Sequence, residues 1–301
     1  MTLDAAIVTK GLTKIYADNL AVNGLDLEVP RGTVYGFLGL NGAGKTTTIK
    51  MLLNLVYPTS GKGMVLGHDI VDETRLIKDK VGYVPEEPVL YEYMHISELL
   101  AFCKDTYSKW DMKTVGKYLD LFELSVGKKV KQLSKGMKNQ LALALALGAN
   151  AELLILDEPT GGLDPAKTRD FFRVILEQVA ETGQTVFFSS HRLYEVERVA
   201  DRVCIIHKGK QVFDKSIDDI KTSFKQIRVV FENEESVNKA GKIDGVASVI
   251  QQGRGCILES SKKPEAIIAA LKEMKPLDIE VIDMNLEGIF LKYTGGENYE
   301  R

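Results

Sequence analysis

A glycine-rich segment with a lysine and a threonine has the residue types needed to bind phosphate. It reads Gly39-Leu40-Asn41-Gly42-Ala43-Gly44-Lys45-Thr46, which fits the pattern G-x-x-x-x-G-K-T, and Thr47 follows it. Glycines let the backbone curl so that N–H groups face phosphate oxygens, and the helix expected over 47–55 adds its positive end. Lys45 would reach the β- and γ-phosphates, and the Thr46 hydroxyl would bind Mg²⁺. The alternative is an ordinary glycine-rich turn before a surface helix.

Two carboxylates follow a second apolar segment. Leu153–Leu156 is fully apolar and precedes Asp157-Glu158-Pro159. Open α/β sheets bind ligands at the carboxyl ends of their parallel strands. Asp157 would hold Mg²⁺, commonly through water, and Glu158 would polarise the water that attacks a γ-phosphate. An acidic pair at an exposed strand end is the alternative.

The segments that would position these groups alternate between strand and helix. Residues 5–12 and 20–29 have the alternation and turns of an antiparallel β portion. The run Leu141–Leu147 alternates Leu with Ala, and we predict a helix because both are strong helix formers. Runs rich in Val, Ile, Phe and Leu predict strands of a largely parallel sheet at 34–38, 81–84, 153–156, 186–189 and 203–206. The predicted fold class is therefore α/β, a P-loop NTPase-type sheet with an antiparallel portion and a helical subdomain.

From about residue 224 the pattern changes. The order strand, helix, strand, strand, helix, strand is typical of a small split-βαβ domain, with a hairpin turn at 253–255. A last helix over 286–293 has Asn285 as its N-cap and Gly295 as its C-cap. We expect one domain at 1–220, with its helical subdomain at about 87–150, and a small α+β domain at 224–301.

Composition and charge limit the class of protein. A chain of 301 residues with 45% hydrophobic and 27% charged residues suits a globular protein of two folding units. The net charge of −3 and pI near 5.9 argue against a general affinity for nucleic acid. The longest apolar run, 141–156, is too short to span a bilayer, and residues 1–4 lack a signal-peptide pattern. We therefore expect a cytoplasmic protein with three lone thiols, Cys103, Cys204 and Cys256.

The order of five motifs is more specific than any one of them. The phosphate loop is followed by Leu133-Ser134-Lys135-Gly136-Met137, Asp157-Glu158, Gly162-Leu163-Asp164 and Ser189-Ser190-His191. On these motifs the chain resembles the ATP-binding-cassette (ABC) family of ATPases over residues 1–220. The resemblance implies ATP and Mg²⁺ as cofactors, and two head-to-tail cassettes that enclose the nucleotide.

The resemblance also implies roles for residues outside the phosphate loop. Ser134 and Gly136 would contact the γ-phosphate bound by the other subunit, although this chain has Lys135 and Met137 where the family has Gly and Gln. Asp164 would communicate across the dimer.

Three further residues line up with positions of the family's nucleotide site. His191 would hydrogen-bond the γ-phosphate. Tyr16 would stack on adenine, with a half-buried strand-end tyrosine as the alternative. Glu86 stands where the family usually has the Gln that touches Mg²⁺ and senses the membrane subunit.

The implied function is that of the ATP-hydrolysing subunit of an ABC transporter, of the exporter-like branch associated with drug, antibiotic or ion efflux. Its implied partners are separate transmembrane permease subunits and a second copy or homologous ATPase subunit, and its place is the inner face of the cell membrane. The family docks a helix of the permease on the segment 87–100, here with Val89, Leu90, Tyr91, Tyr93 and Met94. A buried aromatic cluster is the alternative for that segment.

Two other functions stay open. A soluble ABC ATPase that acts on ribosomes or DNA usually has two cassettes, a coiled-coil insertion or basic arms. This chain has one phosphate loop, no sustained heptads and an acidic balance. A nucleotide-binding regulator that does not hydrolyse is disfavoured by the intact Glu158 and His191.

Overall fold

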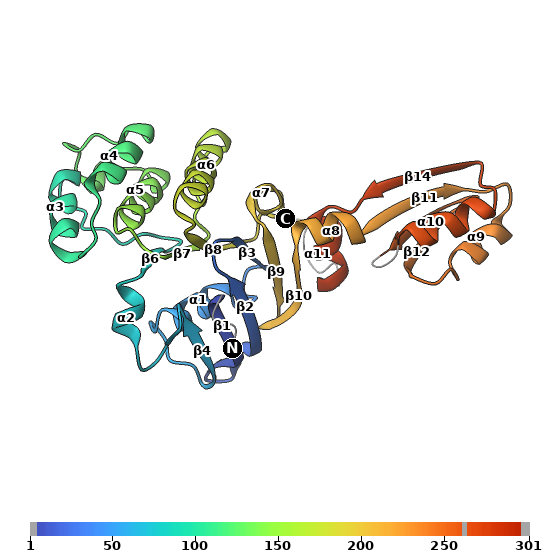
Figure 1. The fold of residues 1–301 in the computed structure, drawn as a ribbon, viewed down its shortest axis with the longest axis horizontal. Helices are drawn as coiled ribbons and strands as arrows, with labels where there is room; N and C mark the ends of the chain where they lie inside the picture. The colour runs from blue at the N-terminus through green and yellow to red at the C-terminus, as the bar shows by residue number, and fades with distance from the viewer. Residues whose placement is uncertain (1–4, 261–263, 296–301) are drawn as a thin grey trace. The chain divides into compact units, whose positions relative to one another are not determined.

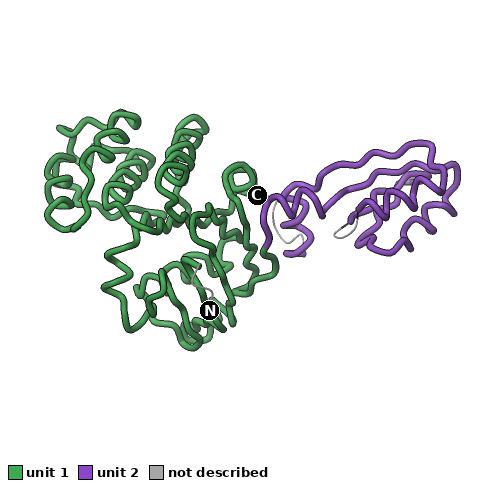
Figure 2. The backbone as a smooth tube through the Cα atoms, viewed as in Figure 1, with its two compact units in different colours: residues 1–214 green, residues 215–301 purple. Residues whose placement is uncertain are grey.

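The computed structural model describes residues 5–260 and 264–295 and divides the chain into two compact units (Figure 2). Unit 1 is residues 1–214, and unit 2 is residues 215–301. Residues 1–4, on which the signal-peptide argument rests, lie outside the described ranges. Among the described residues, none of the helices is long and apolar enough to cross a membrane.

A six-stranded sheet forms the centre of unit 1 (Figure 1). Strands β9, β3, β8, β7 and β6 pair in parallel, so the mostly parallel sheet is confirmed. Every residue of β3, β7 and β8 is buried, as continuous apolar runs predict for strands covered on both faces. In spatial order the strands are β10 (Lys210–Ser216), β9 (Arg202–His207), β3 (Val34–Leu38), β8 (Thr185–Ser190), β7 (Leu153–Asp157) and β6 (Val81–Val84).

A second, antiparallel sheet covers one face of the central sheet together with α1 (Lys45–Leu52). Ile7, Leu25 and Ile49 bury their side chains with Phe187 of β8 in one core. Its strands, in spatial order, are β2 (Asn19–Pro30), β1 (Ala5–Tyr16), β4 (Ser60–Val65) and β5 (His68–Asp69). The expected antiparallel portion is confirmed, but β1 runs on to Tyr16, which pairs with Asn19. The end of this hairpin is exposed on both faces, so its residues do not alternate between apolar and polar. The sequence pattern therefore did not extend the strands to the turn.

Helices cover the other face of the central sheet. Phe188 of β8 contacts Phe172 with ring centroids 5.6 Å apart, and Gly36 leaves room for Val196. The helices that supply these contacts and their neighbours are α5 (Lys135–Gly148), α6 (Pro165–Thr182) and α7 (Leu193–Val199). The helix predicted over Leu141–Leu147 is confirmed. All seven of its residues are buried, so its Leu and Ala positions need no amphipathic stripe.

Helices α3, α4 and α5 group together in unit 1 (Figure 1). This group and the short elements near it are α3 (Ile96–Thr106), α4 (Met112–Leu121), the 3₁₀ turn Val130–Gln132 and α2 (Thr74–Lys78). The side chain of Tyr118 donates a hydrogen bond to Gln178 at 3.1 Å, which ties α4 to α6.

Unit 2 contains a four-stranded antiparallel sheet. Its order is β12 (Val246–Gln252), β13 (Gly255–Ser260), β11 (Lys225–Val230) and β14 (Asp278–Asp283). Because β13 is antiparallel to both β11 and β12, these two strands run in the same direction with β13 between them. The split-βαβ arrangement expected from the sequence is confirmed.

Four helices accompany this sheet: α8 (Ile217–Ser223), α9 (Glu234–Ala240), α10 (Pro264–Glu273) and α11 (Leu286–Thr294). Val237 of α9 and Leu271 of α10 are buried against Ile227 and Leu258 of the sheet. Both predicted caps of α11 are confirmed. Asn285 accepts a hydrogen bond from the Gly288 N–H, and Gly295 has a left-handed φ of 75°.

Candidate active site

The carboxyl ends of three central strands lie side by side. Leu38 of β3 pairs with Ser190 of β8, and Asp157 of β7 pairs with Ser189. Strand β3 leads into the glycine-rich loop, β7 ends at the acidic pair, and β8 leads to His191. Motifs that lie up to about 150 residues apart in sequence therefore meet at one edge, as expected for ligand sites of open α/β sheets.

A cavity of about 460 Å³ lies at this edge, a size that suits a small-molecule ligand. The predicted site residues that line it are Tyr16, Leu40, Asn41, Gly42, Gly44, Lys45, Thr46, Thr47, Glu86, Glu158 and His191. Asn19 and Ala21 also line it, and our sequence reasoning missed them. The signal in the sequence was their closeness to Tyr16, because Asn19 and Ala21 follow it by three and five residues, and the structure pairs Tyr16 with Asn19.

The other predicted site residues lie outside the cavity lining. Gly39 begins the loop in a tight place, where an added Cβ would lie 2.7 Å from the carbonyl oxygen of Ile206. Ala43 is buried within the loop, and Asp157 is 1% exposed at the end of β7.

Ser134, Gly136 and Asp164 lie together at the starts of α5 and α6. The Ser134 hydroxyl accepts a hydrogen bond from the Met137 N–H at 3.2 Å, and Asp164 accepts one from the Lys167 N–H at 2.9 Å. An added Cβ on Gly136 would lie 2.8 Å from the carbonyl oxygen of Gly162. The structure therefore places this group away from the cavity of its own chain.

The glycine-rich loop has the backbone of an anion-binding turn. Gly42 and Gly44 have φ angles of 79° and 106°, a region that residues with a Cβ rarely adopt. A Cβ on Gly44 would also lie 2.5 Å from the carbonyl oxygen of Ala21. Such left-handed turns, directly before a helix N-terminus, present backbone N–H groups to phosphate. The loop therefore fits a nucleotide phosphate chain.

The Lys45 ammonium is held inside the cavity. Its side chain is 6% exposed. Nζ donates hydrogen bonds to the carbonyl oxygens of Gly39 at 2.8 Å and Leu40 at 3.3 Å, and lies 3.1 Å from Oε1 of Glu158. The two carbonyl groups take two of the three N–H donors of the lysine, and the contact with Glu158 is an ion pair, because Oε1 of Glu158 accepts no hydrogen bond among the described residues. A phosphate that enters would accept a hydrogen bond from this ammonium and compete with Glu158 for its charge.

Glu158 lies between two partners at the back of the cavity. Its Oε2 lies 2.8 Å from Nδ1 of His191, and its Oε1 faces Lys45. Its backbone has a φ of 45°, which is unfavourable for a residue with a side chain. Its N–H donates to the Ser189 hydroxyl at 3.0 Å. The carboxylate is 12% exposed, so it is reachable from the cavity but largely shielded from water.

A buried hydroxyl group on the neighbouring strand β8 orients Asp157. The Ser189 O–H donates to Oδ1 of Asp157 at 2.6 Å. Nearby, burial and the charge of Asp157 raise the pKa of Tyr83 to about 12, so this phenol stays protonated at neutral pH. Among the described residues, no group of three or more His, Cys, Asp or Glu side chains could hold a metal alone. The side chains of Thr46, Asp157 and Glu86 carry oxygen atoms, the type of donor that Mg²⁺ prefers.

Tyr16 lies at the opening of the cavity. Its side chain is exposed, and Nζ of Lys14 lies 4.9 Å from its ring centroid. An exposed aromatic ring at the mouth of a cavity offers a flat surface to a purine.

A group of exposed apolar side chains lies near the start of α3, and we call it the aromatic patch: Val89, Tyr91, Tyr93 and Phe102. They are 96%, 47%, 69% and 45% exposed, and the Tyr91 ring centroid lies 6.0 Å from Tyr93 and 5.7 Å from Phe102. Leu90 and Met94, which we expected to be exposed as well, are half-buried.

The fold and the strand-end site define a P-loop nucleotide-binding cassette. The family model described as ABC transporter matches residues 22–161. A bacitracin transport ATP-binding protein of Bacillus licheniformis is 38% identical over 221 residues, which cover 73% of this chain and 72% of that protein. A daunorubicin resistance ATP-binding protein of Streptomyces coeruleorubidus is 31% identical over 308 residues, 98% of this chain and 97% of that one.

A solved structure of the ATP-binding subunit of an ABC transporter is 30% identical, with a TM-score of 0.65, and covers 72% of this chain and 92% of its own. The chain belongs to the ABC transporter ATP-binding family. It is an ATPase subunit that binds ATP with Mg²⁺ and hydrolyses it.

Proposed function

We propose that this subunit powers export of a drug, an antibiotic or an ion through separate transmembrane permease subunits, at the inner face of the cell membrane. The observation that carries the proposal is the Glu158 carboxylate, held between Lys45 and His191 inside a cavity lined by the phosphate loop. The bacitracin transport and daunorubicin resistance relatives favour the export branch over a soluble ATPase of ribosomes or DNA.

In this proposal the residues of the phosphate loop, with Tyr16 at its mouth, bind ATP. Lys45 neutralises charge on the β- and γ-phosphates. Thr46, Asp157 and Glu86 hold Mg²⁺, which when bound screens the charge that develops on the transferred phosphoryl group. His191 hydrogen-bonds the γ-phosphate and orients Glu158, and Glu158 accepts the proton of the attacking water.

The ion pair between Lys45 and Glu158 explains how binding prepares this proton transfer. A γ-phosphate competes with Glu158 for the Lys45 ammonium, because phosphate is a strong acceptor for a charged donor. Once Lys45 turns to phosphate, Glu158 keeps only the His191 contact on its carboxylate. Its Oε1 is then free to accept a proton from water. Binding of the nucleotide thereby frees Glu158 to act as the base in hydrolysis of that nucleotide.

We also propose that a second copy, or a homologous ATPase subunit, completes the site. Ser134, Gly136 and Asp164 lie together and outside the cavity of their own chain, which supports their action on the nucleotide of the partner. Lys135 and Met137 stand where the family has Gly and Gln, but α5 still begins directly after Ser134, and the N-terminus of a helix attracts phosphate.

The aromatic patch is the proposed docking surface for a cytoplasmic helix of the permease. Its exposed rings form a contiguous apolar surface, which on a soluble domain often marks a protein contact. Apolar anchors at the centre of an interface carry most of its energy, so Tyr91→Ala should weaken assembly by about 1–3 kcal/mol.

Affinity purification from detergent-solubilised membranes tests this function. We expect a polytopic membrane protein to be recovered with the parent chain and lost with Tyr91→Ala, while nucleotide affinity stays unchanged. Val126→Ala, at an exposed apolar residue outside the patch, is the matched control and should keep the partner. Recovery of ribosomal or DNA-repair proteins without a membrane protein would contradict the proposal.

We propose that residues 1–220 act as the nucleotide-binding domain, with the helical subdomain at about 87–150. Residues 224–301 act as a stabilising or dimer-supporting module. The alignment with the daunorubicin resistance relative extends over 98% of the chain, which supports a module common to both proteins. Removal of the module from the full chain should weaken the ATP-bound dimer more than it lowers nucleotide affinity.

A further inference from the structure

Ser189 connects the two acidic residues of the site through one hydroxyl group. It lies one residue before the end of β8, is fully buried, and pairs with Asp157 across the parallel ladder. Its O–H donates to Oδ1 of Asp157 at 2.6 Å, and its oxygen accepts the Glu158 N–H at 3.0 Å. No solvent competes for either bond, because Ser189 is 0% exposed.

The end of β8 and the residue that follows the strand therefore hold Glu158 at two points. Ser189 fixes its backbone N–H, and His191, two residues further on, contacts its carboxylate. This matters because the Glu158 backbone has a left-handed φ of 45°, which the surrounding contacts must maintain. The same Ser189 hydroxyl orients the Asp157 carboxylate, as outer hydrogen-bond partners of metal ligands do.

We infer that Ser189 is a positioning residue for ATP hydrolysis. It aims the Asp157 carboxylate toward Mg²⁺ and holds the Glu158 peptide in the conformation that directs its side chain to the γ-phosphate. The inference rests on the proposed roles of Asp157 and Glu158. Ser189 itself touches neither nucleotide nor water in this role, because it acts through the two residues that it binds.

The neighbouring residue supplies a matched control. Ser190 is on the same strand and is 2% exposed, but its oxygen accepts the Arg192 N–H, at 2.9 Å, and within 5–260 and 264–295 it bonds neither Asp157 nor Glu158. Ser189→Ala and Ser190→Ala therefore remove the same atom from equally buried places. Only the first change releases Asp157 and Glu158.

The test compares both variants with the parent in steady-state hydrolysis and in binding of a fluorescent ATP analogue, with Mg²⁺ and with EDTA. For Ser189→Ala we expect kcat to fall about 10–100-fold and the half-saturating Mg²⁺ concentration to rise several-fold. The KM for ATP and the analogue affinity in EDTA should stay within about twofold of the parent. Ser190→Ala should match the parent in the Mg²⁺ titration.

A variant that keeps the hydroxyl completes the test. Ser189→Thr should recover most of the lost kcat, which a purely steric role of Ser189 would not predict. Should Ser189→Ala fail to fold, Ser189→Cys replaces it, because a thiol is a weak donor and acceptor and should lower kcat in the same direction. A parental kcat and Mg²⁺ titration in Ser189→Ala or Ser189→Cys, or no recovery in Ser189→Thr, would overturn the inference.

Two further variants separate this inference from the proposed site. Glu158→Gln and Asp157→Asn are measured in the same series. If both are inactive while Ser189→Ala is parental, only the role of Ser189 fails. If both hydrolyse ATP at the parental rate, the proposed site itself is wrong.

Discussion

Lys45 and Glu158 form an ion pair in the cavity that receives the nucleotide, with Nζ 3.1 Å from Oε1. Both side chains are largely buried, at 6% and 12% exposure. Removal of the Glu158 charge would leave the buried Lys45 ammonium beside the neutral carbonyl groups of Gly39 and Leu40. ATP must compete with Glu158 for Lys45, so this contact opposes binding before it serves catalysis.

The competition predicts that Glu158→Gln binds ATP more tightly than the parent does. A neutral amide attracts the Lys45 ammonium less strongly, so the phosphate displaces it at a lower cost. We expect Kd to fall about two- to tenfold, on the order of 1 kcal/mol. Calorimetry with ATP in EDTA measures this directly. A higher Kd for Glu158→Gln would contradict the competition.

Glu86 should contribute to Mg²⁺ binding. Its exposed carboxylate lines the cavity where the family usually has an amide. Near a divalent cation the extra negative charge is favourable, and near unshielded phosphate it is not. Glu86→Gln should raise the half-saturating Mg²⁺ concentration about two- to fivefold, because solvent screens an exposed charge. ATP should still bind.

A Mg²⁺ titration of hydrolysis at saturating ATP checks the prediction for Glu86. The control is Glu87→Gln, whose carboxylate is exposed and pairs instead with Lys135 at 3.0 Å. An unchanged titration in Glu86→Gln would remove Glu86 from the site.

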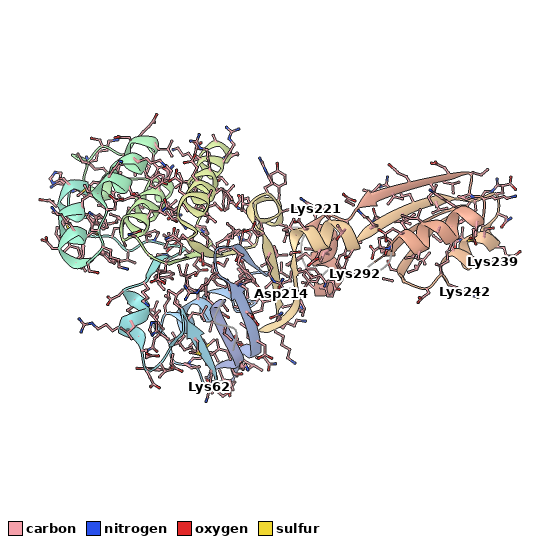
Figure 3. All side chains as sticks on the ribbon, in the orientation of Figure 1. Lys62, Asp214, Lys221, Lys239, Lys242 and Lys292 are labelled. Carbon is pink, nitrogen blue, oxygen red and sulfur yellow. The ribbon has the colours of Figure 1, made fainter. Side chains whose placement is uncertain are left out.

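Tyr35 should make the folded protein sensitive to alkali. Its O–H donates to Oδ2 of Asp214 at 2.6 Å, and Arg202 binds the other carboxylate oxygen (Asp214 is labelled in Figure 3). Burial, together with the charges of Cys204 and Asp214, raises the Tyr35 pKa well above 10. The folded state holds this proton more tightly than the unfolded state does. The contribution of Tyr35 to the free energy of unfolding is therefore fully present below about pH 10 and is lost as pH rises above that value.

Tyr35→Phe should lower the free energy of unfolding at pH 7 by about 1–3 kcal/mol, since Asp214 loses a donor. Between about pH 9.5 and 11, the free energy of unfolding should fall less in Tyr35→Phe than in the parent. Urea unfolding at several pH values measures both effects. Tyr57→Phe, at a side chain that is 65% exposed, should behave as the parent does. An identical alkaline loss in Tyr35→Phe would contradict this account.

Much of the site was predictable because each motif is contiguous and ends a buried strand. The loop at 39–46 and the pair Asp157-Glu158 need only local sequence to be recognised. Parallel strands bring their carboxyl ends together whatever lies between them. The split-βαβ unit was predictable from the order of its strands and helices along the chain.

The contacts that join these motifs were not predictable. The bond from Ser189 to Asp157 depends on the register between β7 and β8, which no local pattern specifies. The Asp214 contact with Tyr35 links residues 179 positions apart. Helix α8 was missed, and the boundary expected between the two domains, at 220–224, falls at its end.

If the phosphate loop of one chain and the start of α5 of the other form one site, two variants that are inactive alone should hydrolyse ATP when they are mixed. Ser134→Arg blocks the start of α5 at an exposed residue, and Lys45→Ala disables the phosphate loop of its own chain. A mixed dimer keeps one intact loop facing one intact α5 start. Mixing the two proteins should therefore raise hydrolysis well above the mean of the separate rates, with activity that increases with protein concentration.

The mixing experiment also shows when this idea fails. Were each chain to hold a complete site, the mixture would hydrolyse ATP only at the mean of the two separate rates. Val126→Ala, at an exposed residue away from the start of α5 in sequence, replaces Ser134→Arg in a control mixture.

The turnover of Glu158→Gln tests the central claim most directly, because the amide keeps the size of the side chain and removes its ability to accept a proton. Hydrolysis of Mg²⁺-ATP by the purified variant is measured beside the parent, at nucleotide concentrations that saturate both. A positioned general base contributes about 10²–10⁴-fold, so kcat should fall by that factor while ATP still binds. A variant that hydrolyses ATP at the parental rate would contradict the account.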